Sequence, residues 1–190
     1  MILGITGGIG SGKSTAADIL KNEYGFLWIS TDSVASELMN SDACCREQLS
    51  GAFGPAIYLE DGTLDKARFR EVLYRSDENR ALSDSIVHPL VWKKVNELCA
   101  DPEEKYLVET ALPSDTFRKF CDKVWVISAA KEVRIERLIK NRGYTREYAE
   151  NIISKQMPEE EICAFADTVI DNSLGYDELK EKIRMAAEAL

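Results

Sequence analysis

The sequence has a single histidine, no Cys-x-x-Cys pair and fewer basic than acidic residues. One histidine, His88, excludes a metal site built from several histidines, and the five cysteines match no zinc-binding spacing. We therefore expect free thiols in a reducing cytoplasm. The 24 lysine and arginine residues against 33 aspartates and glutamates leave a formal net charge of −9. This acidic balance argues against a nucleic-acid-binding surface, which needs surplus basic residues.

Long apolar runs are also absent. No run approaches the ~18 residues that a transmembrane helix needs, and the apolar stretch at 1–6 is too short for a signal peptide. We expect a cytoplasmic protein without a membrane partner, acting as a monomer or weak homo-oligomer. The chain has 190 residues, of which 45% are hydrophobic and 30% charged, and this suits one compact α/β domain.

Apolar segments of strand length alternate with helical patterns at both ends of the chain. The strand-length segments lie at 2–5, 26–29, 106–108, 124–127 and 168–170, and helical patterns cover 13–22, 131–141 and 176–190, with others opening near 30 and 145. Strands without alternating polarity are typical of a parallel sheet covered on both faces. We predict a five-stranded parallel sheet, with a mainly helical insertion at about 42–101.

Residues 7–14, GGIGSGKS, match the phosphate-loop pattern G-x-x-x-x-G-K-[ST] at every defined position. The segment follows a predicted strand and opens a predicted helix, as the pattern requires. Glycines let backbone N–H groups converge on phosphate oxygens, and the helix dipole adds positive potential. We expect Lys13 to reach the β- and γ-phosphates of ATP and Ser14 to bind Mg²⁺. The predicted nucleotide contacts are Gly8, Ile9, Gly10, Ser11, Gly12, Lys13, Ser14 and Thr15.

The loop alone leaves three classes open: a kinase of a small acceptor, a GTPase-type switch and a mechanical ATPase. The sequence contains no Asn-Lys-x-Asp guanine reader, and the apolar run before Glu109 ends in one acid rather than the Asp-Glu pair usual in mechanical ATPases. Short length and a basic segment late in the chain favour a small-molecule kinase.

Four segments together resemble the dephospho-coenzyme A kinase family. They are ITGGIGSGKST at 5–15, FG at 53–54 followed by GTLDK at 62–66, IVHP at 86–89 and ADTVIDN at 166–172. The resemblance extends over 2–179 and implies a single P-loop kinase domain over 1–190, three-layered, with an acceptor-binding insertion and a short helical lid at about 140–160. It implies phosphorylation of the ribose 3′-hydroxyl of dephospho-CoA by ATP and Mg²⁺, the last step of coenzyme A synthesis. It places Asn172 at the nucleotide and Leu64, Asp65 and His88 at the acceptor.

Three segments depart from the family's patterns. Ser30 and Ser36 stand where the family commonly has Asp and Arg, TALPS at 110–114 replaces Pro-Leu-Leu-Phe-Glu, and one arginine of an R-x-x-x-R pattern is displaced to Arg142. The class is unaffected by these changes. Two alternatives stay open: another nucleoside or metabolite kinase of the same fold, and a nucleotide-sensing protein without an acceptor.

Two acids follow predicted strands at the carboxyl edge of the sheet, where the phosphate loop also lies. Asp32 could take the proton of an attacking hydroxyl or could cap a helix, and the resemblance favours the catalytic role. Glu109 could hold a Mg²⁺-bound water or a substrate group, or could be a solvated charge at a strand end. The only histidine, His88, is either a core histidine beside a turn or part of the acceptor pocket.

The segment 131–146 is basic within an acidic chain. Six basic residues against two acids, Glu132 and Glu136, give +4; the basic residues are Lys131, Arg134, Arg137, Lys140, Arg142 and Arg146. The cluster predicts a lid over the triphosphate, with Gly143 as a hinge. We expect Arg137 and Arg142 to contact the transferring phosphate, because arginine forks fit its oxygens.

Overall fold

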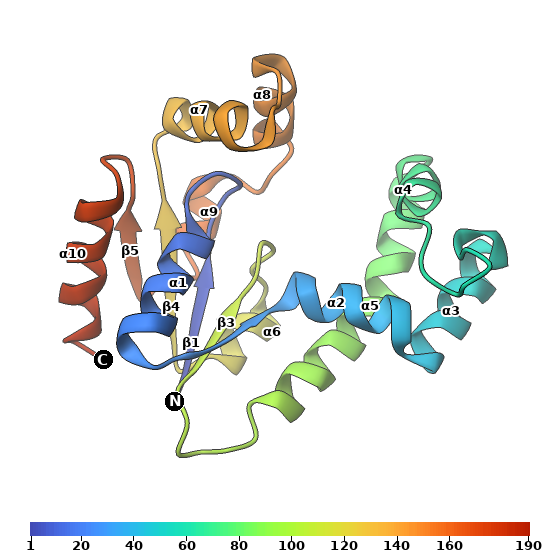
Figure 1. Cartoon of the computed structure of the whole chain (residues 1–190), viewed down its shortest axis with the longest axis horizontal. Coiled ribbons are helices and arrows are strands. Elements are labelled where there is room, and N and C mark those ends of the chain that lie inside the picture. Colours follow the sequence, from blue (N-terminus) through green and yellow to red (C-terminus); the bar gives the residue numbers. More distant parts are fainter. The chain divides into compact units, whose positions relative to one another are not determined.

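The computed structural model describes all 190 residues of the chain and contains one five-stranded parallel sheet (Figure 1). Its strands run in the order β2-β3-β1-β4-β5, and each neighbouring pair is parallel. Their bounds are β1 (Ile2–Thr6), β2 (Leu27–Ser30), β3 (Tyr106–Glu109), β4 (Lys123–Ser128) and β5 (Thr168–Asp171). The predicted parallel α/β fold is confirmed, and β1 lies at the centre of the sheet.

Ten α-helices and one 3₁₀ turn connect and cover the strands. They are α1 (Lys13–Tyr24), α2 (Thr31–Ser41), α3 (Ala43–Phe53), the turn Pro55–Ile57, α4 (Lys66–Tyr74), α5 (Asp77–Leu98), α6 (Asp115–Phe120), α7 (Lys131–Arg142), α8 (Arg146–Ser154), α9 (Glu159–Cys163) and α10 (Tyr176–Ala187). Several begin at a capping side chain: Thr145 accepts from the N–H of Tyr148 at the start of α8, as Ser114 does from Phe117 before α6. The short helix α6 was not predicted from the sequence. No helix is both long and apolar enough to cross a bilayer.

The chain forms two compact units, which are described separately. The sheet unit comprises Met1–Ser30 and Asp101–Leu190, and the helical unit comprises Thr31–Ala100. The helical unit therefore begins before residue 42, where the sequence analysis placed the start of the insertion. The reason is that α2 packs against α5.

Side chains of β1 alternate between the two faces of the sheet. Leu3 and Ile5 are fully buried in a cluster with residues of α1 and α10. Gly4 points to the other face, where a Cβ atom would lie 2.6 Å from the ring of Phe117 on α6. Helices thus cover both faces, and the absence of a side chain at Gly4 lets α6 approach the central strand closely.

The helical unit is organised around α5. Helices α2, α3 and α4 pack against this long helix, which contains Pro89 in its interior. An isolated antiparallel bridge joins Tyr58 to Leu64 in the connection between α3 and α4. The unit contains no strand of the sheet, in keeping with its mainly helical sequence pattern.

Candidate active site

The glycines of the phosphate loop make room for the side chains of Asn172 and Arg134, which belong to distant parts of the sequence within the sheet unit. A Cβ atom at Gly12, whose φ is +100°, would lie 2.2 Å from Nδ2 of Asn172. A Cβ atom at Gly8 would lie 2.3 Å from the Arg134 guanidinium. Any larger residue at either position would displace a buried polar group, so the loop needs glycine for packing as well as for phosphate access.

Lys13, the first residue of α1, lies along the loop that precedes it. Its Nζ donates to the carbonyl oxygens of Gly7 at 2.8 Å and Gly8 at 3.2 Å. These bonds hold the ammonium group beside the loop at the positive end of α1. The arrangement provides a fixed cation at the phosphate loop.

Glu109 joins the loop to two strands at the carboxyl edge of the sheet. Ser14 Oγ donates to its Oε1 at 3.4 Å, and Trp28 Nε1 donates to its Oε2 at 3.1 Å. Glu109 is 9% exposed, and its backbone pairs in register with Ile5 and Ser30. A solvated strand-end charge is therefore not what the structure shows, because the carboxylate is buried and bonded on both oxygens.

A hydroxyl and a carboxylate at this edge suit the oxygen chemistry of Mg²⁺. No group of three or more His, Cys, Asp or Glu side chains could hold a metal alone. Mg²⁺ usually keeps several waters and takes one or two protein oxygens together with substrate phosphates. Ser14 and Glu109 fit that pattern, in which most ligands come from outside the protein.

Glu109→Gln tests this arrangement. The amide keeps the shape of the side chain but removes the charge that would orient Mg²⁺ or its water. We expect roughly a ten-fold rise in the Mg²⁺ concentration needed for half-maximal turnover, with little change in thermal stability. Glu104→Gln, at an exposed position before β3, is the matched control. An unchanged Mg²⁺ requirement in Glu109→Gln would limit Glu109 to a structural role.

Asn172 and Arg137 fasten the loop to the end of β5. Asn172 is 4% exposed, and its Nδ2 donates to the carbonyl of Ser11 at 2.7 Å. Arg137 donates through Nη2 to the Asn172 carbonyl at 2.7 Å, and through Nη1 to the carbonyls of Ser11 at 3.3 Å and Gly10 at 3.4 Å. The structure thus brings two predicted site residues onto the loop from distant parts of the sequence. A contact of Arg137 with the transferring phosphate stays a prediction.

Arg142 differs from Arg137 in its surroundings. It is the exposed last residue of α7 and precedes Gly143, which has a φ of +67°. Its guanidinium makes no hydrogen bond or ion pair within the structure, so its donors are available to a phosphate. Its role in transfer also stays a prediction.

The two arginines should respond differently to alanine. Arg142→Ala is expected to lower kcat by about 10²-fold while ADP affinity changes little, because its contact would form mainly in the transition state. Arg137→Ala should weaken ADP binding as well, since it also releases the loop from Asn172. Isothermal titration with ADP and steady-state kinetics separate the two effects, with Arg184→Ala on α10 as a surface control. If Arg142→Ala changes only the KM for the acceptor, Arg142 belongs to acceptor recognition.

Three side chains at this site were not predicted from the sequence. Trp28 bonds to Glu109, Arg134 lies against Gly8, and Gln156 accepts from the N–H of Ile9 at 2.9 Å. Trp28 and Gln156 lie in no recognised motif. Arg134 belongs to the basic segment predicted as a lid, although its position four residues before a buried leucine puts it on the core face of α7.

The predicted acceptor residues lie in the helical unit. Leu64 is buried, and its N–H donates to Asn40 Oδ1 at 2.9 Å. Asp65 caps α4 by accepting from the N–H groups of the second and third residues of that helix. The interpretation of His88 as a core histidine beside a turn is wrong: it lies inside α5, its side chain is 52% exposed, and Nε2 is 3.6 Å from Asp84 Oδ1. Acceptor binding by Leu64, Asp65 and His88 stays a prediction.

Asp32 is the second residue of α2 and is exposed. The helix begins at Thr31, so Asp32 lies within the first turn rather than at the N-cap. Its carboxylate accepts no hydrogen bond within the structure. Asp32 is therefore not a helix cap. Its negative charge near the positive end of α2 is favourable, and its carboxylate is available for a substrate.

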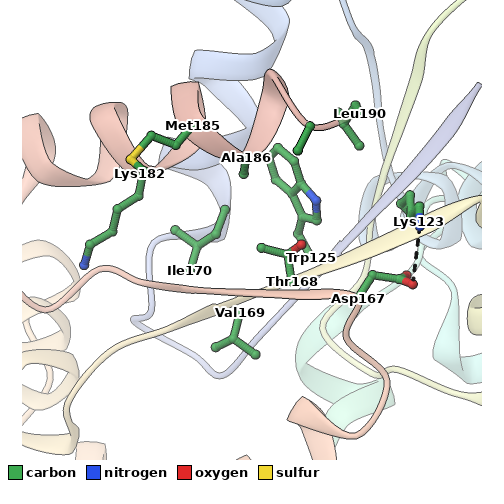
Figure 2. A pocket seen from close by; sticks show the side chains of 11 residues that line it. Lys123, Trp125, Asp167, Thr168, Val169, Ile170, Lys182, Met185, Ala186 and Leu190 are labelled. Carbon is green, nitrogen blue, oxygen red and sulfur yellow. Dashed lines mark ion pairs between the residues drawn. The ribbon is translucent and has the colours of Figure 1, made fainter.

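A separate pocket of about 420 Å³ lies between α10 and the strands β4 and β5 (Figure 2). It shares no residue with the phosphate loop. Trp125 and Met185 contribute apolar surface, while its two lysines are paired, Lys123 with Asp167 at 3.9 Å and Lys182 with Asp171 at 3.2 Å. With its charges neutralised in this way, the pocket offers no free cation for a phosphate.

A parallel sheet whose central strand ends in a complete phosphate loop defines a P-loop nucleotide-binding protein. The family model for dephospho-CoA kinase matches residues 1–178, and the chain belongs to this family of kinases. A dephospho-CoA kinase of Carboxydothermus hydrogenoformans is 33% identical over 187 residues, which cover 96% of this chain and 90% of the relative.

Two solved structures resemble the whole chain. The crystal structure of TT1252 from Thermus thermophilus has a TM-score of 0.84 at 28% identity and covers 100% of this chain and 96% of its own. A dephospho-CoA kinase from Campylobacter jejuni has a TM-score of 0.73 at 23% identity, covering 98% and 95%, which shows the shared fold.

Proposed function

We propose that this protein transfers the γ-phosphoryl group of ATP to the ribose 3′-hydroxyl of dephospho-CoA, giving CoA and ADP. One observation carries the proposal: a complete phosphate loop, in its strand-to-helix context, lies in a chain that matches the dephospho-CoA kinase family over 1–178. In the transfer, the acceptor oxygen forms a bond to the γ-phosphorus as the bond to the β–γ bridging oxygen breaks.

The residues of the loop and of α7 would stabilise the charge that develops on the transferring group. Lys13 would contact the β- and γ-phosphates while its bonds to the loop carbonyls keep it in place. Arg142, which has no partner within the protein, would add a second cation from the lid. Ser14 and Glu109 would hold Mg²⁺, which shields the phosphate charges when bound.

Asp32 would act as the general base. It accepts the proton that leaves the 3′-hydroxyl as the oxygen attacks phosphorus, which requires hydrogen-bond reach to that hydroxyl in the complex. Its exposed and unbonded carboxylate supports this assignment. The helical unit would bind the rest of the acceptor through the region of Leu64, Asp65 and His88.

The decisive experiment measures ADP release by the purified protein with ATP and Mg²⁺, with and without dephospho-CoA. Nucleosides and shikimate serve as alternative acceptors, and Lys13→Ala serves as the inactive control. We expect ADP release that depends on dephospho-CoA and forms CoA in equal amount. Turnover with another acceptor instead would support a different metabolite kinase, and ATP binding without any turnover would support a nucleotide sensor.

Two further expectations belong to this proposal. We expect the reaction to take place in the cytoplasm, because dephospho-CoA and ATP are both small soluble molecules. The enzyme should act as a monomer or weak homo-oligomer, which sedimentation velocity across a range of protein concentrations would test.

A further inference from the structure

Ile9, in the middle of the phosphate loop, is held at three points by α7, α8 and the connection that follows α8. Its side chain packs against a cluster formed by Ile135, Leu138 and Ala149 of α7 and α8. Its carbonyl oxygen accepts from Arg134 Nε at 2.9 Å. Its N–H donates to the side-chain oxygen of Gln156, also at 2.9 Å. Both backbone polar groups and the side chain of this one residue are therefore engaged.

Arg134 and Gln156 form one connected group. The Arg134 Nη2 donates at 2.7 Å to the same Gln156 Oε1 that accepts from Ile9. A ring of three bonds thus links α7, the phosphate loop and the connection between α8 and α9. Lysine could not reproduce it easily, because the ring uses two donors of a planar guanidinium in fixed directions.

Burying the Arg134 guanidinium costs free energy, so its position points to a function. The residue is 8% exposed, and its guanidinium lies where a Cβ atom at Gly8 would be. Burial lowers the pKa of Arg134 from its ordinary value, an effect that the nearby Glu159 carboxylate partly offsets. Its donors bond to a loop carbonyl and a glutamine rather than to an acid, so the buried positive charge itself adds little to the stability of the fold.

We infer that Arg134 and Gln156 are positioning residues that hold Ile9, and with it the phosphate loop, in the shape that binds the triphosphate. Few other bonds restrain residues 7–9: Ser11 N donates to the Gly8 carbonyl at 3.2 Å, and Lys13 donates to the carbonyls of Gly7 and Gly8. A loop ordered before ATP arrives loses less conformational freedom on binding, so affinity should depend on the ring. The inference rests on the proposed function only in taking ATP as the nucleotide.

The test measures the affinity for a non-hydrolysable ATP analogue with Mg²⁺ by isothermal titration, with no acceptor present. Arg134→Met and Gln156→Leu remove the bonds while keeping much of the side-chain volume, and Arg184→Met on the surface of α10 is the matched control. We expect an affinity loss of about ten-fold or more for Arg134→Met and of several-fold for Gln156→Leu. The control should stay within two-fold of the unchanged protein.

The double variant distinguishes a joint role from two separate ones. If both side chains act through Ile9, combining the substitutions should lose no more affinity than Arg134→Met alone. Fully additive losses, or wild-type affinity in both single variants, would overturn the inference. Arg134→Lys keeps the charge without the two-donor fork, so restored affinity in that variant would also overturn it.

If Arg134→Met fails to fold, Gln156→Leu still tests the inference. Gln156→Leu leaves the guanidinium and its bond to the Ile9 carbonyl in place and changes a half-buried residue outside any helix, so the protein should still fold, with a modest loss of thermal stability, while affinity falls. Unchanged affinity in a folded Gln156→Leu protein would contradict the inference. Because binding is measured without dephospho-CoA, the result is independent of whether dephospho-CoA is the acceptor.

Discussion

Lys13→Ala is expected to abolish phosphoryl transfer while leaving the fold intact. The structure holds the Lys13 ammonium beside the loop through the carbonyls of Gly7 and Gly8, where it would meet the β- and γ-phosphates. Removing the main cation from a developing negative charge should lower kcat by on the order of 10³-fold or more. Single-turnover rates with dephospho-CoA measure the effect, and circular dichroism with thermal melting checks the fold.

Lys21→Ala is the matched control for this substitution. Lys21 lies in the last turn of the same helix, is exposed and belongs to no part of the proposed site. Its replacement should leave both turnover and ADP affinity within about two-fold, as for most surface changes. Near-normal turnover in Lys13→Ala would remove the phosphate loop from the proposed mechanism.

Asp32→Asn is expected to reduce kcat by about 10²-fold or more with little change in stability. The amide has nearly the shape of the carboxylate but cannot accept the proton of the 3′-hydroxyl. Because Asp32 lies within the first turn of α2 and accepts no hydrogen bond there, loss of its charge should cost only about 0.3–1 kcal/mol through the helix dipole. Rapid-quench measurement of the chemical step, together with thermal melting, separates catalysis from stability.

Asp177→Asn provides the control for the helix-dipole effect. Asp177 is the second residue of α10, as Asp32 is of α2, and both are exposed. The two variants should therefore lose similar, small amounts of stability, while only Asp32→Asn loses activity. An active Asp32→Asn protein would end the general-base assignment and make Glu109 the next candidate.

The phosphate loop could be predicted in full because its chemistry is local. Consecutive residues from Gly7 to Ser14 supply the turn, the N–H groups and the cation, so no distant contact is needed to recognise them. The strands could be predicted for a related reason, since a buried parallel strand is a short continuous apolar run. Short helices such as α6, with few residues and weak periodicity, lacked a comparable pattern.

The contacts around the loop could not be predicted, because they join segments far apart in the chain. The sequence allows Glu109 to be a functional residue or a solvated charge, and only the folded structure shows its carboxylate bonded to Ser14 and Trp28. Arg134 belongs to the basic segment predicted to form a lid over the triphosphate, but α7 buries it against Gly8. Nothing within α7 alone shows what its core face will meet.

The sequence by itself determined the nucleotide loop and the kinase family through contiguous motifs, and the parallel α/β class through short-range periodicity. Only the tertiary structure decided the strand order, the extent of the helical unit and the network that ties Ile9, Glu109 and Asn172 to their partners. The physical reason is that strand pairing and side-chain burial depend on which surfaces meet after the chain has folded. A pattern read along the chain records the preference of each segment but not its neighbours in space.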